Sequence, residues 1–112
     1  MPFIDLKINK KLTDSQKNDL RYGLAEAIDV IPGKKNWLMT EINDSCELYF
    51  HDSAEPAAMI SVSIYGNGTS AQFSKITGII TETVNKTAGV SPDRVYVKYD
   101  TTEHWGWNGS NF

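Results

Sequence analysis

Cysteine is nearly missing from this sequence of 112 residues, and with it the chemistry that paired thiols support. Because Cys46 is the single cysteine, neither an intrachain disulfide nor a cysteine-rich zinc site can form. The two histidines, His51 and His104, stand far apart and lack the spacing of metal ligands. We therefore expect no metal site and no cofactor.

Strong charge and long apolar runs are missing too. The formal net charge is only −3 at pH 7, which argues against nucleic acid and anionic membranes as partners. No apolar run is long enough to span a membrane, and the first residues lack the charged and apolar segments of a secretory signal. The sequence therefore predicts a cytoplasmic protein.

What is present is the composition of an ordinary globular domain. Hydrophobic residues make up 40% of the chain and charged residues 22%, which is typical of soluble folded proteins. The length suits one domain over residues 1–112, with a modest core.

The first half of the chain predicts a strand, a helix and a second strand. Residues 2–9 alternate between apolar and polar, as in a half-buried strand. Thr13 and Gln16 form a capping-box pattern, and the apolar spacing that follows predicts an amphipathic helix over residues 14–31. Residues 36–42 are then expected to form the second strand.

The same order returns in the second half. Residues 57–65 predict an apolar strand, and Ser70 is expected to cap a helix that Gly89 ends. Residues 94–99 are rich in β-branched and aromatic side chains and predict the next strand. Between the two halves, residues 46–51 are expected to form a short extra strand.

Two such units define the expected architecture. A crossover of this length joins parallel strands, so the units predict an α+β fold: a four-stranded sheet with two helices on one face. The opposite face is expected to carry apolar residues and to need a cover. A second copy of the chain is the simplest cover, with residues 46–51 and the aromatic tail pairing with neighbouring sheets. Homo-oligomerisation follows from this argument.

The first two residues, Met1 and Pro2, carry a chemical signal of their own. An initiator methionine is normally removed before a residue as small as proline, and Pro2 would then carry a secondary amine that can act as base or nucleophile. Proline also suits the first position of a strand, because no ladder hydrogen bond is lost there. These two residues alone leave both interpretations open.

Five segments of the chain together resemble one known family. They are residues 1–4 (MPFI), 32–35 (PGKK), 53–57 (SAEPA), 91–99 (SPDRVYVKY) and 105–112 (WGWNGSNF). Through them, and over essentially its whole length, the chain resembles the macrophage migration inhibitory factor family, its bacterial-type members included, within the tautomerase superfamily.

The resemblance implies a β-α-β repeat fold assembled as a homotrimer, with active sites at the subunit interfaces. It also implies interconversion of the keto and enol forms of an α-keto acid such as phenylpyruvate, with Pro2 as the general base. Relatives leave cells without a secretory signal, so leaderless secretion stays compatible with the sequence.

The resemblance also assigns polar contacts to the substrate. Lys34 matches the family's substrate-binding lysine, which holds a carboxylate, and Lys35 is the competing position. Tyr65 stands where a backbone N–H helps to bind substrate. Tyr96 matches a tyrosine that lines the pocket from the adjacent subunit, and Lys98 stands where the animal protein has an asparagine. The alternatives are packing within the sheet for Tyr96 and a solvated surface for the lysines.

Three aromatic residues, Trp37, Trp107 and Phe112, would form a rim suited to a phenyl substrate. The alternative for Trp37 is packing in the core. The alternative for Trp107 and Phe112 is docking of the tail at the trimer interface.

Two rival functions remain. The first is a non-catalytic, cytokine-like binding or signalling protein of the same fold. The second is hydration of an unsaturated acid, which ranks lower because branches that catalyse it use extra arginines and this chain has only Arg21 and Arg94. Ala57 and Ile60 stand where the animal cytokine has a Cys-x-x-Cys pair, so no thiol-oxidoreductase activity is expected.

Overall fold

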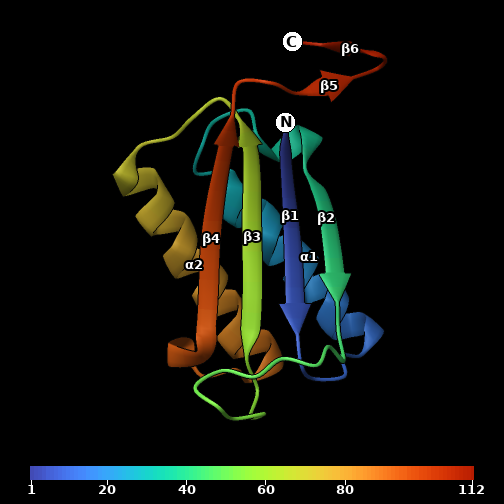
Figure 1. Ribbon diagram of the computed structural model, residues 1–112, viewed down its shortest axis with the longest axis vertical. Coiled ribbons are helices and arrows are strands. Elements are labelled where there is room, and N and C mark those ends of the chain that lie inside the picture. Colours follow the sequence, from blue (N-terminus) through green and yellow to red (C-terminus); the bar gives the residue numbers. More distant parts are fainter.

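Two helices lie against one face of a four-stranded sheet in the computed structural model, which describes residues 1–112 (Figure 1). The sheet has the order β2-β1-β3-β4. Its strands are β1 (Pro2–Ile8), β2 (Met39–Asn43), β3 (Ala58–Tyr65) and β4 (Val95–Thr102). The helices are α1 (Asp14–Ile28) and α2 (Ser70–Ala88). This confirms the α+β architecture that the sequence predicts.

Each half of the chain forms one β-α-β unit. Strand β1 is parallel to β2, and β3 is parallel to β4, as expected of crossover connections. The two units meet at the centre of the sheet, where β1 and β3 run antiparallel. In this pairing Pro2 lies opposite Ile64, so the start of β1 adjoins the end of β3.

The core lies between the sheet and the helices. Alternate residues of β1 and β3 are fully or nearly buried, and so is one stripe of each helix. The largest fully buried side chains are Ile4, Leu6, Ile8, Leu20, Leu24, Ile28, Ile60, Val62, Ile64, Ile76, Ile80 and Val84. All are apolar, so burial fixes which face of each central strand meets the helices.

Capping side chains set where the helices begin. The Thr13 hydroxyl accepts from the Gln16 N–H and the Gln16 side chain accepts from the Thr13 N–H, which confirms the capping box of α1. Helix α2 has the same arrangement, with Thr69 as its cap; the expectation that Ser70 caps this helix is therefore wrong. Gly89 ends α2 in the left-handed conformation at φ 70°, as predicted.

Helix α1 ends earlier than the predicted residue 31. After Ile28 the backbone tightens: the N–H groups of Val30 and Ile31 donate to carbonyls only three residues back. The strand predicted over residues 36–42 is likewise shifted. A short 3₁₀ helix, η1 (Lys35–Trp37), comes first, and β2 begins only at Met39. A second 3₁₀ turn, η2 (Pro92–Arg94), precedes β4 and delays its start to Val95.

The extra strand predicted over residues 46–51 does not form. The segment is a loop with a single bridge between Phe50 and Ser53, and both His51 and Asp52 have positive φ. Two side chains from other elements hold it. The Asn9 amide donates to three loop carbonyls and accepts from the Ala57 N–H. The Arg94 guanidinium donates to four loop carbonyls, one of which, that of Glu55, also accepts from Asn9. Long-range side-chain contacts therefore replace strand pairing here.

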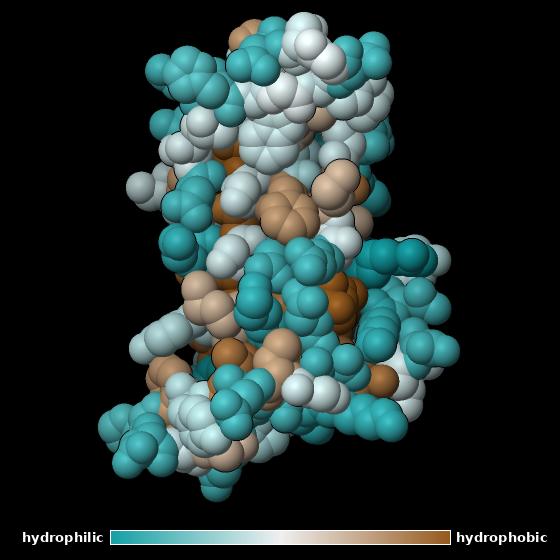
Figure 2. Space-filling model, turned by 45° about the vertical axis from the view of Figure 1, so that its right-hand side comes forward, coloured by the Kyte–Doolittle hydropathy of each residue, from teal (hydrophilic) through white to brown (hydrophobic).

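The sheet face away from the helices is more polar than expected. At its centre, alternate strand positions carry the polar residues Asp5, Lys7, Glu41, Asn43, Ser61, Ser63, Lys98 and Asp100. Apolar residues on this face gather toward the strand ends: Phe3, Met39 and Tyr65 at one end, Met59 and Tyr96 at the other. Figure 2 shows hydrophilic side chains over most of the visible surface, with hydrophobic ones between them. The expectation of an apolar open face is therefore wrong for its centre.

After β4 the tail turns back in a small hairpin of β5 (Gly106–Trp107) and β6 (Ser110–Asn111). The Phe112 N–H donates to the Trp105 carbonyl and closes this hairpin. Both chain ends lie at the same end of the molecule (Figure 1). Neither helix combines the length and the hydropathy needed to cross a membrane.

Candidate active site

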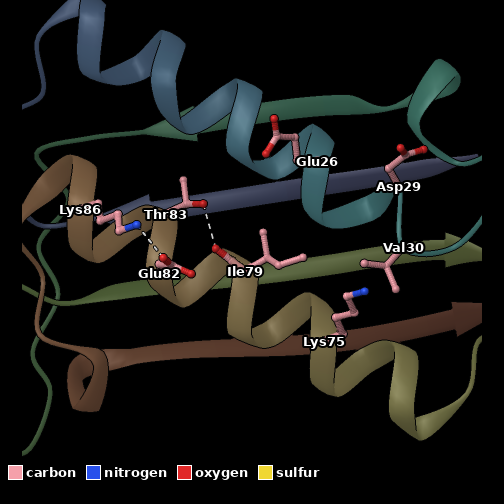
Figure 3. Close-up of a pocket in the computed structure, with 8 residues that line it drawn as sticks. All are labelled: Glu26, Asp29, Val30, Lys75, Ile79, Glu82, Thr83 and Lys86. Atoms are coloured by element: carbon pink, nitrogen blue, oxygen red, sulfur yellow. Dashed lines mark hydrogen bonds and ion pairs between the residues drawn. The ribbon is translucent and has the colours of Figure 1, made fainter.

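The largest cavity is a groove between the two helices, on the outside of the helix layer (Figure 3). It has a volume of about 560 Å³ and is lined by Glu26, Asp29, Val30, Lys75, Ile79, Glu82, Thr83 and Lys86. Glu82 and Lys86 pair across one helical turn at 2.6 Å. None of the site residues predicted from the sequence lines this groove. No group of three or more His, Cys, Asp or Glu side chains is arranged to hold a metal ion.

A second cavity, of about 470 Å³, opens at the start of β1. We call it the Pro2 cavity. Three segments build it: the beginning of β1, the η1–β2 connection and the tail. Its lining is Met1, Pro2, Phe3, Asn36, Trp37, Leu38, Met39, Trp105, Gly106 and Trp107. Most of these side chains are hydrophobic, so the cavity suits a ligand with an apolar body.

Pro2 is buried and is the first residue of β1. In this structure Met1 precedes it, and the free amine belongs to Met1. Burial lowers the pKa of the Met1 amine below its ordinary value of 8.0, and the nearby positive charge of Lys34 lowers that pKa further. The environment at the head of β1 thus favours a neutral amine.

Lys34 lies beside the N-terminal residues. Its ammonium donates to the Tyr65 carbonyl oxygen at 2.6 Å, and the Tyr65 N–H donates to the Met1 carbonyl at 3.1 Å. Lys35 lies elsewhere, in a groove on α1 that includes Arg21. The structure therefore places Lys34 next to the candidate amine and Lys35 apart from it.

The aromatic residues predicted as a rim gather around the same end of the sheet. The Trp37 and Trp107 rings meet edge to face, with centroids 5.6 Å apart, and Phe112 packs on Tyr65 at 5.2 Å. Trp37 is 56% exposed, so the core-packing interpretation of this residue is wrong. In a single chain Trp107 and Phe112 are also about half exposed, at 51% and 53%.

Tyr96 and Lys98 do not join this group within one chain. Tyr96 lies opposite Met59 near the start of β3, whereas Pro2 lies opposite Ile64 near its end. Five strand residues at about 3.3 Å each separate these positions by about 17 Å. Tyr96 instead packs edge to face on Phe50 at 4.9 Å. Lys98 pairs with Asp100 at 3.4 Å on the open face.

Sequence reasoning missed several residues that line the Pro2 cavity, among them Phe3, Asn36, Leu38 and Trp105. Trp105 lies in a segment that carries the family resemblance, which was the available signal for it. The other three come from the η1–β2 connection and the open side of β1. Their roles depend on how that connection passes the chain terminus, which local patterns do not reveal.

The two arginines lie outside the Pro2 cavity. Arg94 is engaged with the loop over residues 50–56, and Arg21 lies on α1. A hydration mechanism that needs extra arginines beside Pro2 therefore finds none in this chain.

Two parallel β-α-β units joined antiparallel, with a proline at the head of a central strand, define a tautomerase-fold protein. The family model described as macrophage migration inhibitory factor (MIF) matches residues 1–112, and the chain belongs to this family. Membership supports a function of the MIF or tautomerase type, in a fold that is oligomeric and binds small molecules.

Solved structures are similar over nearly the whole chain. MIF2 from Leishmania major is 30% identical, with a TM-score of 0.88 over 100% of this chain and 97% of that chain. MIF from Toxoplasma gondii is 20% identical, with a TM-score of 0.91 over 98% and 99% of the two chains. The MIF homologue from Prochlorococcus marinus is 18% identical, with a TM-score of 0.89 over 98% of each. No curated protein sequence matches the chain.

Proposed function

We propose that this protein interconverts the keto and enol forms of an α-keto acid such as phenylpyruvate. Pro2, freed by removal of Met1, is the general base. The observation that carries the proposal is the setting of Pro2: buried at the head of a central strand, in a mainly hydrophobic cavity, with the Lys34 ammonium close by.

The base must be neutral at working pH in order to accept a proton. The pKa of the amine at this end of the chain is lowered, first by burial and then by Lys34. Once Met1 is removed, the amine passes to Pro2, which lies deeper in the same environment, and both causes continue to act on it. The resulting amine is matched to proton transfer near neutral pH.

Removal of Met1 would also make room for the substrate in the Pro2 cavity. Met1 lines the cavity and its carbonyl accepts the Tyr65 N–H, so its loss widens the cavity and leaves that N–H free to donate. The Lys34 ammonium uses one donor on the Tyr65 carbonyl and retains others for a carboxylate. A substrate carboxylate between Lys34 and the Tyr65 N–H would hold the reacting carbon over Pro2.

The reaction then needs only proton transfers. Pro2 removes a proton from the carbon next to the ketone, and the negative charge passes to the ketone oxygen, which takes up a proton from water to give the enol. The protonated Pro2 amine then returns its proton to water and is neutral again. The rim of Trp37, Trp107 and Phe112 offers aromatic surface for a phenyl group.

Tyr96 and Lys98 fit this proposal only if a neighbouring chain supplies them. They lie about 17 Å and 10 Å along the sheet from Pro2, by the residue spacing of β3. We assign them to the neighbouring subunit of a homotrimer with the site at the interface. The exposed Tyr96 ring and the exposed aromatic tail are the surfaces that would meet.

The test is enol-to-ketone conversion of phenylpyruvate, followed by ultraviolet absorbance, on protein whose intact mass shows that Met1 is absent. Pro2→Gly should lower kcat/KM by roughly 10²- to 10⁴-fold, the usual range for loss of a general base. Pro92→Gly changes an exposed proline in η2 and serves as the matched control.

Two outcomes would contradict the proposal. One is full turnover by the Pro2→Gly variant, and the other is no turnover by wild-type protein with its Pro2 amine confirmed free. The second outcome would instead support the non-catalytic, cytokine-like binding function. Protein that retains Met1 should be inactive, because its Pro2 nitrogen is an amide.

A further inference from the structure

We propose that a groove on the outer side of α1 binds an organic carboxylate that has a flat apolar body. The groove has a volume of about 460 Å³. Its lining residues are Arg21, Tyr22, Ala25, Lys35, Asn36, Leu38 and Thr40. We call it the Arg21 groove. It is separate from the Pro2 cavity and the proposal does not depend on the tautomerase function.

The charge of this groove has one sign. Arg21 and Lys35 are its charged residues, and no carboxylate lines it. Neither of them takes part in any of the four ion pairs of the chain, which use Lys7, Lys17, Lys86 and Lys98. In a protein of net charge −3, two uncompensated cations in one depression form a local site for an anion.

The groove between the helices differs from the Arg21 groove in the charges that line it. It is larger, but Lys75 and Lys86 share it with Glu26, Asp29 and Glu82. An anion entering there would meet three carboxylates, and Lys86 is already paired with Glu82 at 2.6 Å. Volume alone therefore does not identify an anion site in this molecule, whereas the composition of the Arg21 groove does.

The walls of the Arg21 groove suit an apolar body behind the carboxylate. Tyr22 is 64% exposed, and the Arg21 guanidinium carbon lies 5.4 Å from the centre of its ring. Leu38 and Ala25 add apolar surface. The Arg21 guanidinium has no carboxylate partner, so its planar donors are available for bidentate contact with the carboxylate of a ligand. A phenyl or similar ring could then lie on the Tyr22 and Leu38 surface.

The position of the groove separates it from the proposed substrate site. Asn36 and Leu38 line both depressions, so the η1–β2 connection forms a wall between them. Lys34, which lies beside the N-terminal residues, does not line the Arg21 groove, and Lys35 does not line the Pro2 cavity. Lys34 therefore lies on the side of the N-terminal residues, and Lys35 lies in the Arg21 groove.

The test is a titration of the full chain with benzoate, followed by ¹H–¹⁵N chemical shifts. Benzamide, which has nearly the same shape but no charge, is the control ligand. We expect saturable shifts for the amides of Tyr22, Lys35 and neighbouring residues with benzoate, and much smaller ones with benzamide. Raising the salt concentration should weaken the benzoate shifts, because exposed charges are screened.

Variants identify the groups responsible. The double variant R21Q/K35Q should weaken benzoate binding at these amides by roughly tenfold or more, since it removes both charged donors. K75Q/K86Q makes the same change of net charge in the helix groove and should leave the affinity unchanged. Pro2→Gly and Lys34→Gln should also leave it unchanged, which separates this site from the proposed active site.

The proposal is overturned if R21Q/K35Q, shown to be folded by circular dichroism, binds benzoate as tightly as wild type at these amides. It is also overturned if benzamide shifts the same amides equally, or if Lys34→Gln alone abolishes every shift, because benzoate would then occupy only the Pro2 cavity. Arg21 and Lys35 are both exposed, so the double variant is expected to fold.

Discussion

The Lys34 ammonium donates to the Tyr65 carbonyl oxygen at 2.6 Å, and this bond fixes the lysine beside the head of β1. On the proposed function the same ammonium holds the substrate carboxylate. Lys34→Gln should therefore lower kcat/KM for phenylpyruvate by roughly 10- to 100-fold, mainly through a higher KM. Lys35→Gln is the matched control and should retain activity. Equal losses in the two variants would remove Lys34 from the anchoring role.

The pH dependence of the reaction should report the amine. Because burial and the Lys34 charge favour its neutral form, the Pro2 amine should lose its proton below the ordinary α-amine pKa of 8.0. The neutral amine is the base, so kcat/KM should rise with pH and level off above a midpoint lower than 8. In Lys34→Gln the midpoint should move upward. A midpoint that does not respond to Lys34 would show that another group controls the profile.

Arg94 should contribute strongly to stability through the loop over residues 50–56. Its guanidinium donates to four loop carbonyls, at 2.9 to 3.1 Å. Arg94→Gln should lower the free energy of unfolding by about 1–3 kcal/mol, measured by urea denaturation, because several of those carbonyls lose a charged donor. Arg21→Gln makes the same change at an exposed position and should cost less than about 0.5 kcal/mol. Similar values for the two variants would mean that water replaces the Arg94 contacts without loss.

Two helical glycines should respond in opposite directions to alanine. A Cβ on Gly23 would lie 2.2 Å from Thr83 Cγ2, and Thr83 cannot turn away without losing the bond that its hydroxyl donates to the Ile79 carbonyl at 2.8 Å. Gly23→Ala should therefore destabilise the protein by about 1–3 kcal/mol. Gly78 meets nothing within 4 Å, so Gly78→Ala should stabilise α2 by about 0.5–1 kcal/mol. Thermal unfolding measures both, and a stabilised Gly23→Ala variant would show that the helices can move apart at low cost.

Local sequence patterns predicted the strands and helices well, because burial of alternate residues and helix capping depend on residues that are close together in the sequence. Alternation in β1 and β3 reports which face is buried, and the Thr13 capping box marks the start of α1 in the sequence itself. The prediction of a strand over residues 46–51 failed because the conformation of this loop is set by distant residues. Its sequence alternates like a strand, but its conformation is set by Asn9 and Arg94, which are about 40 residues away along the chain.

The candidate site was predictable in part, because some of its residues lie in segments that carry the family resemblance. Pro2 and Lys34 lie in segments that carry the family resemblance, and the structure brings them to one end of the sheet. Asn36 and Leu38 were missed because their neighbours at the cavity come from β1 and the tail. The hydrophobic periodicity of the sequence does not show that these distant segments lie together. The polar centre of the open face was readable from Ser61 and Ser63, whose alternation with buried residues places them there.

The opposite placement of Pro2 and Tyr96 along β3 has a genetic consequence on the proposed function. Each site would draw its base from one subunit and its tyrosine from the next. A chain carrying Pro2→Gly and a chain carrying Tyr96→Phe would then be defective in different halves of the same site. Unfolded and refolded together, the two variants would form mixed assemblies in which some interfaces combine an intact Pro2 with an intact Tyr96. Activity would return from two impaired parents, and an allele damaged at either end would be complemented by one damaged at the other.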